Sequence, residues 1–253
     1  MSTIPEGILA GRRVLVTGGS RGIGRGIVEA MTAAGARVAL AARTREQVER
    51  AAEEIHGASG HVCDVSETHR IPALVDEVED ALGGPLTSVV HAAGVQHREA
   101  AEDFNLDAFR RLLEVNLTGP FALTQHIAKR QLDLGTGGEH LFIGSLTSFI
   151  SMRGIAGYGA AKSGVYGLVR ALSTEWSARG IRVNGIAPGY IRTDLTEAVF
   201  ADEEWRRVHL ARIPQGRFGE AGDIGGAAVF LVSPLAAHIT GHMLPVDGGW
   251  LAA

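Results

Sequence analysis

The chain of 253 residues has one cysteine, two lysines and no long apolar run. Because Cys63 is alone, no disulfide can form within the chain, and its setting in His-Val-Cys-Asp-Val predicts a small buried strand residue. No apolar run approaches the ~20 residues that a membrane span needs, and residues 1–10 lack the charged and apolar regions of a secretory signal. These absences predict a soluble, cytoplasmic protein with no membrane partner.

Neither sign of charge dominates the chain. The sequence has 24 Lys and Arg against 28 Asp and Glu, a formal net charge of -4, and the two signs are interspersed. A nucleic-acid-binding protein concentrates positive charge in a patch or a stripe. We therefore expect a small-molecule partner rather than a nucleic acid, and no metal site.

Hydrophobic residues make up 45% of the chain, enough to bury one substantial core. Short aliphatic runs alternate with longer segments of helical period, the pattern of a parallel sheet with crossover helices. We predict one α/β domain over residues 1–253, a Rossmann-type doubly wound fold with a seven-stranded parallel sheet and helices on both faces. The predicted strands are Arg12 to Thr17, Arg37 to Ala42, His61 to Cys63, Ser88 to His91, His140 to Ser145, Arg182 to Ile186 and Met243 to Val246, and the predicted helices are Gly24 to Ala34, Arg45 to Ile55, Thr68 to Leu82, Leu106 to Leu134, Tyr158 to Ala178 and Ala221 to Val232.

One long segment, residues 190–217, lies outside this alternation and is rich in charge and aromatic residues. It follows the sixth predicted strand. Doubly wound sheets bind ligands at the carboxyl ends of their strands, where long loops cover them. We expect this segment to cover a substrate.

A glycine-rich loop follows the first predicted strand and precedes an amphipathic helix: Thr17-Gly18-Gly19-Ser20-Arg21-Gly22-Ile23-Gly24. Gly18 allows a tight turn, Gly22 lets the backbone approach a pyrophosphate, and Gly24 permits close packing of helix against strand. The amino end of the helix offers free N–H groups to the anion. A glycine-rich loop alone can be an ordinary βα turn, but within a strand-loop-helix unit it predicts a dinucleotide site.

The end of the second predicted strand usually separates NAD from NADP enzymes, because an acidic side chain there binds the ribose 2′-OH and repels a 2′-phosphate. This stretch is Val38-Ala39-Leu40-Ala41-Ala42-Arg43 and has no carboxylate. Ala42 leaves room, Arg43 can pair with a phosphate, and Arg21 could add a second charge. We predict NADP(H) as the preferred cofactor, with NAD(H) as the second option; the alternative is that Arg43 is a solvated charge.

Lysine is so scarce that its position after a tyrosine is informative. Of the 24 basic residues 22 are arginine, and only Lys129 and Lys162 are lysine. An ammonium group is compact, so it can bind ribose hydroxyls and lower the pKa of a neighbouring phenol, whereas a guanidinium is a broad planar fork. Tyr158 and Lys162 would lie one helical turn apart, with Ser145 thirteen residues before the tyrosine. The spacing alone is common in helices without chemistry, so its meaning depends on the other motifs.

These motifs resemble those of the short-chain dehydrogenase/reductase family along essentially the whole chain. The glycine motif is residues 17–24, the adenine-binding strand end is Cys63-Asp64-Val65, and His91-Ala92-Ala93-Gly94 corresponds to an Asn-Asn-Ala-Gly motif. The catalytic tetrad and the loop beside the nicotinamide correspond to Asn116, Ser145, Tyr158 and Lys162, and to Pro188-Gly189-Tyr190-Ile191-Arg192-Thr193. His91 departs from the usual Asn, which affects a structural hydrogen bond of that strand but not the chemistry.

The resemblance implies hydride transfer between a nicotinamide and a secondary alcohol or ketone. Such a reaction needs a group that exchanges a proton with the substrate oxygen, and Tyr158 is expected to do so. Lys162 would favour the phenolate and hold the nicotinamide ribose, Ser145 would donate a hydrogen bond to the substrate oxygen, and Asn116 would hold a water in a proton relay. The residues expected to contact the cofactor are Gly18, Ser20, Arg21, Gly22, Ile23, Gly24, Arg43, Asp64, Val65, Ala92, Ala93, Gly94, Tyr158, Lys162, Pro188, Gly189, Ile191 and Thr193. The family also implies a homotetramer, with contacts suggested by the apolar long helices and the Gly-Gly-Trp ending.

Several short sequence motifs resemble those of the sugar-acid branch of this family, the gluconate 5-dehydrogenases and 2-deoxy-gluconate 3-dehydrogenases. They are Val95-Gln96-His97-Arg98-Glu99, Ala187-Pro188-Gly189-Tyr190, Ala211-Arg212-Ile213-Pro214-Gln215-Gly216-Arg217 and the ending Val246-Asp247-Gly248-Gly249-Trp250-Leu251-Ala252. A carboxylate substrate suits an arginine fork, and Arg98, Arg153 or Arg192 could supply it. Ser145 and Tyr158 would meet the substrate oxygen.

Two alternatives to a sugar acid remain open. An apolar pocket for an acyl or steroid-like ketone could be lined by Leu146, Phe149, Ile150, Met152 and Leu195, which would suit a 3-oxoacyl-thioester reductase or another ketone reductase. A protein of a different class, a non-catalytic NADP-binding sensor, typically lacks the tyrosine-lysine pair that this chain keeps.

Overall fold

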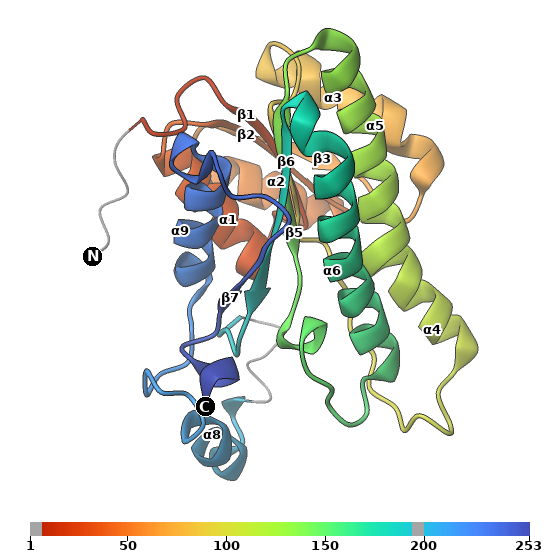
Figure 1. Cartoon of the computed structure of the whole chain (residues 1–253), viewed down its shortest axis with the longest axis vertical. Coiled ribbons are helices and arrows are strands. Elements are labelled where there is room, and N and C mark those ends of the chain that lie inside the picture. Colours follow the sequence, from red (N-terminus) through yellow and green to blue (C-terminus); the bar gives the residue numbers. More distant parts are fainter. Residues whose placement is uncertain (1–6, 194–199) are drawn as a thin grey trace.

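Seven parallel strands form one sheet in the order β3-β2-β1-β4-β5-β6-β7. The computed structural model describes residues 7–193 and 200–253. The strands are β1 (Arg13–Thr17), β2 (Arg37–Ala42), β3 (Ala58–Val62), β4 (Ser88–His91), β5 (Gly138–Ile143), β6 (Ile181–Pro188) and β7 (Met243–Val246). The predicted doubly wound α/β fold is thereby confirmed (Figure 1).

Helices cover both faces of this sheet (Figure 1). They are α1 (Gly22–Ala33), α2 (Arg45–Glu54), α3 (Ile71–Leu82), α4 (Leu106–Leu113), α5 (Gly119–Leu134), α6 (Ala156–Trp176), α8 (Glu203–Leu210) and α9 (Ala221–Val232). Within residues 7–193 and 200–253, no helix combines the length and the apolar character that a membrane crossing requires.

Alternate side chains of β1 enter two different hydrophobic layers. Val14 and Val16 pack in a cluster with residues of α1 and α9, whereas Leu15 packs in a cluster with residues of α3 and α5. All three side chains are fully buried. A parallel strand buried on both faces is expected to be a continuous aliphatic run, which explains the composition of the central strands.

The order of the strands reverses beside β1. β2 and β3 lie on one side of it, and β4 to β7 lie on the other. The register places Thr17, at the end of β1, opposite His91, at the end of β4. Ligands of doubly wound sheets bind in the crevice at such a switch point, and both the glycine loop and residues 92–94 begin there.

The ends of several predicted elements differ by one to three residues from those in the structure, and two differences concern the element itself. The third strand is Ala58–Val62 rather than His61 to Cys63, because the backbone of Ala58, Ser59 and Gly60 pairs with β2 although these side chains are poor strand formers. The predicted helix from Leu106 to Leu134 is interrupted by a π-helical turn at Glu114–Thr118.

The segment that was expected to cover the substrate contains a helix that the sequence did not predict. α8 lies within residues 190–217, at the lower end of the molecule beyond the carboxyl end of β6 (Figure 1). Residues 194–199 of this segment, including Leu195, lie outside the described residues.

Candidate active site

The glycine loop and the loop after β4 touch at the crevice beside β1. Gly18 has a φ of 69°, a left-handed conformation that favours glycine. A Cβ atom on Gly18 would lie 2.7 Å from the N and Cα atoms of Ala93 and 2.8 Å from the carbonyl carbon of Ala92. The carbonyl of Thr17 also accepts a hydrogen bond from the N–H of Ala92 at 3.2 Å. Glycine is therefore required where two predicted cofactor-binding segments meet.

The amino end of α1 is suited to an anion. Gly22, with a φ of 54°, begins the helix, and no acidic side chain lies in its first turn. Free N–H groups and the helix dipole favour negative charge at this end. Arg21 and Arg43 are exposed, and neither guanidinium forms an ion pair within the described part of the chain. A Cβ atom on Gly22 would lie 3.4 Å from Cγ2 of Thr193, so the predicted Thr193 borders the same loop.

Packing fixes the remaining residues of the glycine loop. Ser20 is buried, and Ile23 packs against the cluster that joins α1 to the sheet. A Cβ atom on Gly24 would collide with the carbonyl oxygen of Gly18. These three residues shape the loop from within.

Asp64, predicted at the adenine end, is held by an ion pair that the sequence did not reveal. Its Oδ2 accepts a hydrogen bond from Arg111 of α4 at 2.7 Å, and its Oδ1 accepts from the N–H and hydroxyl of Ser66 at 3.0 and 2.7 Å. Burial raises the pKa of Asp64, but these bonds outweigh it and hold the pKa at about 2. Val65 is buried next to it. Asp64 is therefore ionised at neutral pH and braces the loop after β3.

Asn116 lies in the π-helical turn and is 1% exposed. Its Oδ1 accepts from the N–H of Val95 at 3.2 Å, and its Nδ2 donates to the carbonyls of Val95 and Leu112 at 3.0 and 2.9 Å. A Cβ atom on Gly94 would lie 2.9 Å from Oδ1 of Asn116 and 3.9 Å from Nζ of Lys162. The fold therefore brings Gly94, Asn116 and Lys162 together from three separate elements.

Ser145 caps a short 3-10 turn, Leu146–Ser148, after the end of β5. Its Oγ accepts from the N–H of Thr147 at 3.2 Å, and its own N–H donates to Oγ of Ser148 at 3.3 Å. The Ser148 hydroxyl donates to the carbonyl of Lys162 at 2.9 Å. This bond attaches the serine turn to α6 and fixes Ser145 relative to the tyrosine-lysine face.

Tyr158 and Lys162 lie one turn apart on α6, with Nζ of the lysine 5.7 Å from the centroid of the tyrosine ring. Lys162 is 5% exposed and donates to the carbonyl of Ile143 at 2.7 Å, and burial lowers its pKa to about 8. Burial raises the pKa of Tyr158, and the neighbouring Ser145 side chain partly opposes this rise. The sequence predicted a phenol pKa lowered by the lysine. The direction is the opposite, because removing the phenol from water is the larger effect.

His91, which departs from the family's Asn, begins a buried hydrogen-bonded chain. Its Nε2 lies 2.8 Å from Oγ1 of Thr124, and this hydroxyl lies 2.7 Å from Nδ1 of His140. Nε2 of His140 lies 2.9 Å from Oε1 of Gln131, whose amide nitrogen donates to the carbonyl of Leu86 at 3.0 Å. Oε1 of Gln131 can only accept, so Nε2 of His140 donates to it and Nδ1 of the neutral His140 accepts from the hydroxyl of Thr124. Nε2 of His91 in turn donates to Thr124. Burial lowers the pKa of both histidines, that of His140 to about 3, so both are neutral at pH 7.

The Pro-Gly loop follows β6 and is anchored on two sides. Pro188 is the last residue of β6, and the N–H of Gly189 donates to the carbonyl of Val246 at 3.0 Å. Ile191 pairs with Gly219 in an isolated parallel bridge. The predicted cofactor residues of this loop are therefore held at the carboxyl end of the sheet.

The three arginines predicted for the substrate lie in different surroundings. Arg98 is exposed and close enough to Tyr190 that its charge lowers the pKa of that tyrosine, which burial raises. Arg192 instead lies over the ring of Phe200, with its Cζ 5.8 Å from the ring centroid. Arg153 is exposed in the loop before α6. Of these three, Arg98 therefore has the position best suited to a ligand beside Tyr190.

Arg212 is a candidate that the sequence reasoning missed. It follows α8, its Cζ lies 4.2 Å from the ring centroid of Trp250, and its charge also lowers the pKa of Tyr190. The available signal was its place in the phrase Ala211-Arg212-Ile213-Pro214, which resembles the sugar-acid branch.

The apolar residues expected to line the alternative pocket do not lie together in the structure. Leu146 is buried in a cluster with Trp250, and Met152 packs against that cluster. Phe149 and Ile150 are 40% and 38% exposed. The described residues therefore place two of these side chains in a packed core and two at the surface.

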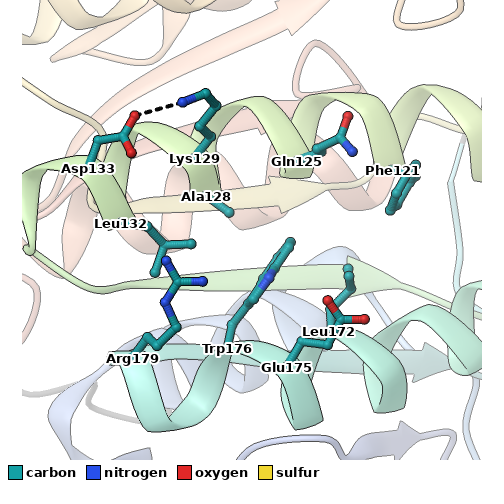
Figure 2. A pocket seen from close by; sticks show the side chains of 10 residues that line it. All are labelled: Phe121, Gln125, Ala128, Lys129, Leu132, Asp133, Leu172, Glu175, Trp176 and Arg179. Atoms are coloured by element: carbon teal, nitrogen blue, oxygen red, sulfur yellow. Dashed lines mark hydrogen bonds and ion pairs between the residues drawn. The ribbon is translucent and has the colours of Figure 1, made fainter.

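A pocket of about 330 Å³ lies away from these residues, between α5 and α6. Figure 2 shows Trp176 of α6 and Leu132 of α5 pointing into it, with the ion pair between Lys129 and Asp133 on its rim. None of the predicted cofactor or catalytic residues lines this pocket.

Known proteins resemble this chain over nearly its whole length. A family model described as Enoyl-(Acyl carrier protein) reductase matches residues 18–251. The chain is 39% identical over 247 residues to the 2-dehydro-3-deoxy-D-gluconate 5-dehydrogenase of Bacillus subtilis, covering 96% of each.

Two solved structures have the same fold. One is a gluconate 5-dehydrogenase from Burkholderia cenocepacia in complex with NADP and tartrate, with a TM-score of 0.90, 35% identity and 97% of each chain covered. The other is a short-chain type dehydrogenase/reductase from Mycobacterium marinum, with a TM-score of 0.90, 32% identity and 97% of each chain covered. The chain therefore belongs to the short-chain dehydrogenase/reductase family of oxidoreductases.

Proposed function

We propose that the protein interconverts a secondary alcohol and a ketone with NADP(H), and that its substrate is a sugar acid. The observation that carries this proposal is the unit formed by Ser145, Tyr158 and Lys162. The serine turn is bonded to α6 through Ser148 and the carbonyl of Lys162, and the Ser145 side chain is close enough to Tyr158 to lower the pKa of its phenol. The unit lies at the carboxyl end of the sheet, where this class of fold binds ligands.

The crevice beside β1 fits a dinucleotide that carries a 2′-phosphate. The contact of Gly18 with residues 92 and 93 leaves no room for a side chain, and the amino end of α1 is free of acidic residues. Arg21 and Arg43 would bind the phosphate, since both are exposed and neither forms an ion pair in the described residues. The presence of NADP in the Burkholderia relative supports this preference over NAD.

The rest of the cofactor would be held by residues from three strand ends. We assign Asp64 and Val65 to the adenine half. We assign residues 92–94 and the loop residues Pro188, Gly189, Ile191 and Thr193 to the nicotinamide half. The anchoring of the second loop on β7, through Gly189 and Val246, supports its role as a fixed wall of the site.

When bound, the nicotinamide would give or take the hydride. Tyr158 exchanges a proton with the substrate oxygen, and the Ser145 hydroxyl donates a hydrogen bond to the same oxygen. Because burial raises the pKa of Tyr158, the phenol is protonated at neutral pH and is suited to donate its proton to a ketone. Lys162 would hold the ribose hydroxyls.

Asn116 serves this arrangement through its position. Its side chain is fully bonded to Val95 and Leu112, and it lies beside Gly94. We therefore propose that Asn116 holds the loop after β4 next to Lys162, where a relay water would lie.

The sugar-acid assignment is supported by the relatives and by the charge near Tyr190. The Bacillus and Burkholderia relatives are both named for gluconate-type acids, and the latter was solved with tartrate, a carboxylic acid. Two arginines, Arg98 and Arg212, influence Tyr190 at the start of the segment 190–217. The exposed Phe149 and Ile150 favour the alternative, a 3-oxoacyl-thioester or other ketone reductase.

Steady-state kinetics on a panel of substrates tests this proposal. Gluconate-type acids, an acetoacetyl thioester and cyclic ketones are each measured with NADP(H) and NAD(H). We expect the highest kcat/KM for a sugar acid with NADP(H). A higher value for the thioester would replace the substrate class, equal turnover with NAD(H) would refute the cofactor preference, and NADP(H) binding without turnover on the whole panel would favour a sensor.

We also propose that residues 1–253 form one domain, that residues 190–217 cover the substrate, and that the protein is a homotetramer. Trp250 is 3% exposed within its own chain, so the Gly-Gly-Trp ending presents no free tryptophan to a partner. Support for assembly comes instead from family membership and from the pocket between α5 and α6 (Figure 2). A monomeric mass by sedimentation at micromolar concentration would refute the tetramer.

A further inference from the structure

Two arginines and three rings gather at the carboxyl end of β6, on the substrate side of the proposed site. This arginine-aromatic cluster consists of Arg98, Tyr190, His209, Arg212 and Trp250. The Tyr190 ring is at its centre, with centroid distances of 4.8 Å to Trp250 and 5.0 Å to His209. The proposed transfer of hydride and proton does not use these side chains.

The guanidinium of Arg212 stacks on the ring of Trp250, which serves as its aromatic platform. Its Cζ lies 4.2 Å from the centroid of the Trp250 ring, a stacking contact that arginine makes well. Trp250 is 3% exposed, and its turn is fixed because the carboxylate of Asp247 accepts hydrogen bonds from the N–H groups of Gly249 and Leu251 at 2.9 and 3.0 Å. The arginine is therefore held in place although its own side chain is exposed.

His209 makes this platform rigid from the side of α8. Its ring is stacked on Trp205 at 3.8 Å and lies 5.8 Å from Trp250. Its Nδ1 donates to the carbonyl of Trp205 at 2.8 Å, which fixes the orientation of the ring. An arginine that is already ordered loses less entropy when it binds a ligand.

Arg98 lies in the loop after β4, and its charge lowers the pKa of Tyr190. The neighbouring acid, Glu99, is already bonded, since its carboxylate accepts from the N–H of Asn105 at 2.7 Å and lies 3.0 Å from Nε2 of His97. Neither Arg98 nor Arg212 forms an ion pair with any residue in the ranges 7–193 and 200–253. Two unpaired cations near one hydroxyl repel each other, and an anion between them removes that cost.

The cluster is physically continuous with the serine turn. Leu146, the residue after Ser145, is buried with Trp250 and Ile213 in one hydrophobic cluster, and Tyr190 packs against it. A ligand bound beside Tyr190 therefore lies within reach of the side chains assigned to chemistry.

We propose that Arg212, stacked on Trp250, binds the carboxylate of the substrate together with Arg98, and that the Tyr190 hydroxyl donates a third hydrogen bond to it. This inference rests on the proposed function and adds which side chains distinguish an acid from a neutral alcohol. A carboxylate fits because its two oxygens match the fork of a guanidinium and its single charge is shared by two arginines. A thioester substrate has no charge beside its reacting carbon and would leave both arginines unpaired.

The test compares gluconate with sorbitol, which has a hydroxymethyl group in place of the carboxylate, using NADP+ and the full-length protein. The variants are Arg212→Gln, Arg212→Lys and Arg98→Gln, with Arg50→Gln as the matched control because Arg50 is exposed on α2 and outside the cluster. Loss of a charge-assisted hydrogen bond is expected to raise KM for gluconate by about 10- to 100-fold with little change in kcat. The KM values for sorbitol and for NADP+ should stay constant. In Arg212→Lys the rise in KM for gluconate should be smaller than in Arg212→Gln.

Calorimetry provides a readout that does not depend on turnover. Gluconate is titrated into the NADP+-loaded Tyr158→Phe protein, with and without Arg212→Gln, and the same rise in Kd of about 10- to 100-fold is expected. If gluconate is a substrate but the Arg212 and Arg98 variants behave like Arg50→Gln, this inference is overturned and the proposed function stands. If the wild-type protein reduces neutral ketones or a thioester and turns over no sugar acid, both are overturned.

Discussion

A cation as deeply buried as Lys162 needs partners for its hydrogens, because burying an unpaired charge is costly. One partner is the carbonyl of Ile143, at 2.7 Å, and the ammonium also lies close to Gly94. The broader guanidinium of an arginine would not fit between β5, α6 and the loop after β4 without displacing one of them. This gives a physical reason for a lysine at this position in a chain that uses arginine almost everywhere else.

A prediction at the scale of the residue concerns the choice of cofactor. Arg43→Ala should raise KM for NADP(H) by about 10-fold or more and leave KM for NAD(H) nearly unchanged, because only the 2′-phosphate loses a charged partner. Initial-rate kinetics with both cofactors measure this. Arg45→Ala is the control, since Arg45 is paired with Glu49 on the exposed face of α2. Equal changes for both cofactors would contradict the assignment of Arg43.

Glycines with the same backbone conformation have different roles in different elements. Gly18 and Gly11 both have positive φ, 69° and 79°, but a Cβ atom on Gly11 would meet nothing within 4 Å. Gly11→Ala should therefore cost only the ~1–2 kcal/mol of strain that a left-handed residue carries. This variant is a control for the backbone strain that any substitution of Gly18 also introduces.

Gly18→Ala should do more than strain the backbone, because its Cβ would push the glycine loop away from residues 92 and 93. A displacement of about 1 Å at a site that positions reactants can lower turnover by ~100-fold, and we expect a loss of that size. Cofactor binding and turnover, measured for both variants at equal fractions of folded protein, test it. Equal turnover in the two variants would contradict a contact between these loops that matters for function.

The elements that could be predicted from the sequence are those specified by short local patterns. The glycine loop, the central strands and the tyrosine-lysine helix depend on neighbouring residues, so their sequence signals were clear. The ion pair between Arg111 and Asp64 joins residues 47 positions apart, and the π-helical turn around Asn116 depends on packing against distant parts of the chain. No local pattern indicates either of them. The same reason explains why Arg212 was missed, since its platform, Trp250, comes from the end of the chain.

At the scale of the whole molecule, the chain of hydrogen bonds from His91 to Gln131 ties β4, β5 and α5 together. These bonds require a neutral His140, because its Nδ1 accepts from Thr124, and the pKa of His140 is about 3 in the folded protein against an ordinary value of 6.5. Below pH ~6.5 the unfolded chain binds a proton that the folded protein does not. The contribution of His140 to stability is therefore complete above this pH and declines as the pH falls towards 3.

The free energy of unfolding should consequently fall by about 2 kcal/mol between pH ~7 and pH ~5 through His140 alone. Urea denaturation at the two pH values measures this fall. His140→Gln should reduce it, whereas His56→Gln, at an exposed position, should not. The same pH dependence in the wild type and in His140→Gln would contradict the assignment of this acid sensitivity to His140.

The most direct test of the account as a whole is the turnover of Tyr158→Phe with NADP(H) and a sugar acid, measured beside its affinity for NADP(H). Tyr166→Phe is the matched control, because Tyr166 lies on the same helix but contacts Phe149 and Arg170 instead of Ser145. The account predicts that Tyr158→Phe binds NADP(H) nearly as well as the wild type and loses at least ~100-fold in turnover, the usual effect of removing a general acid. Unchanged turnover in Tyr158→Phe would contradict it.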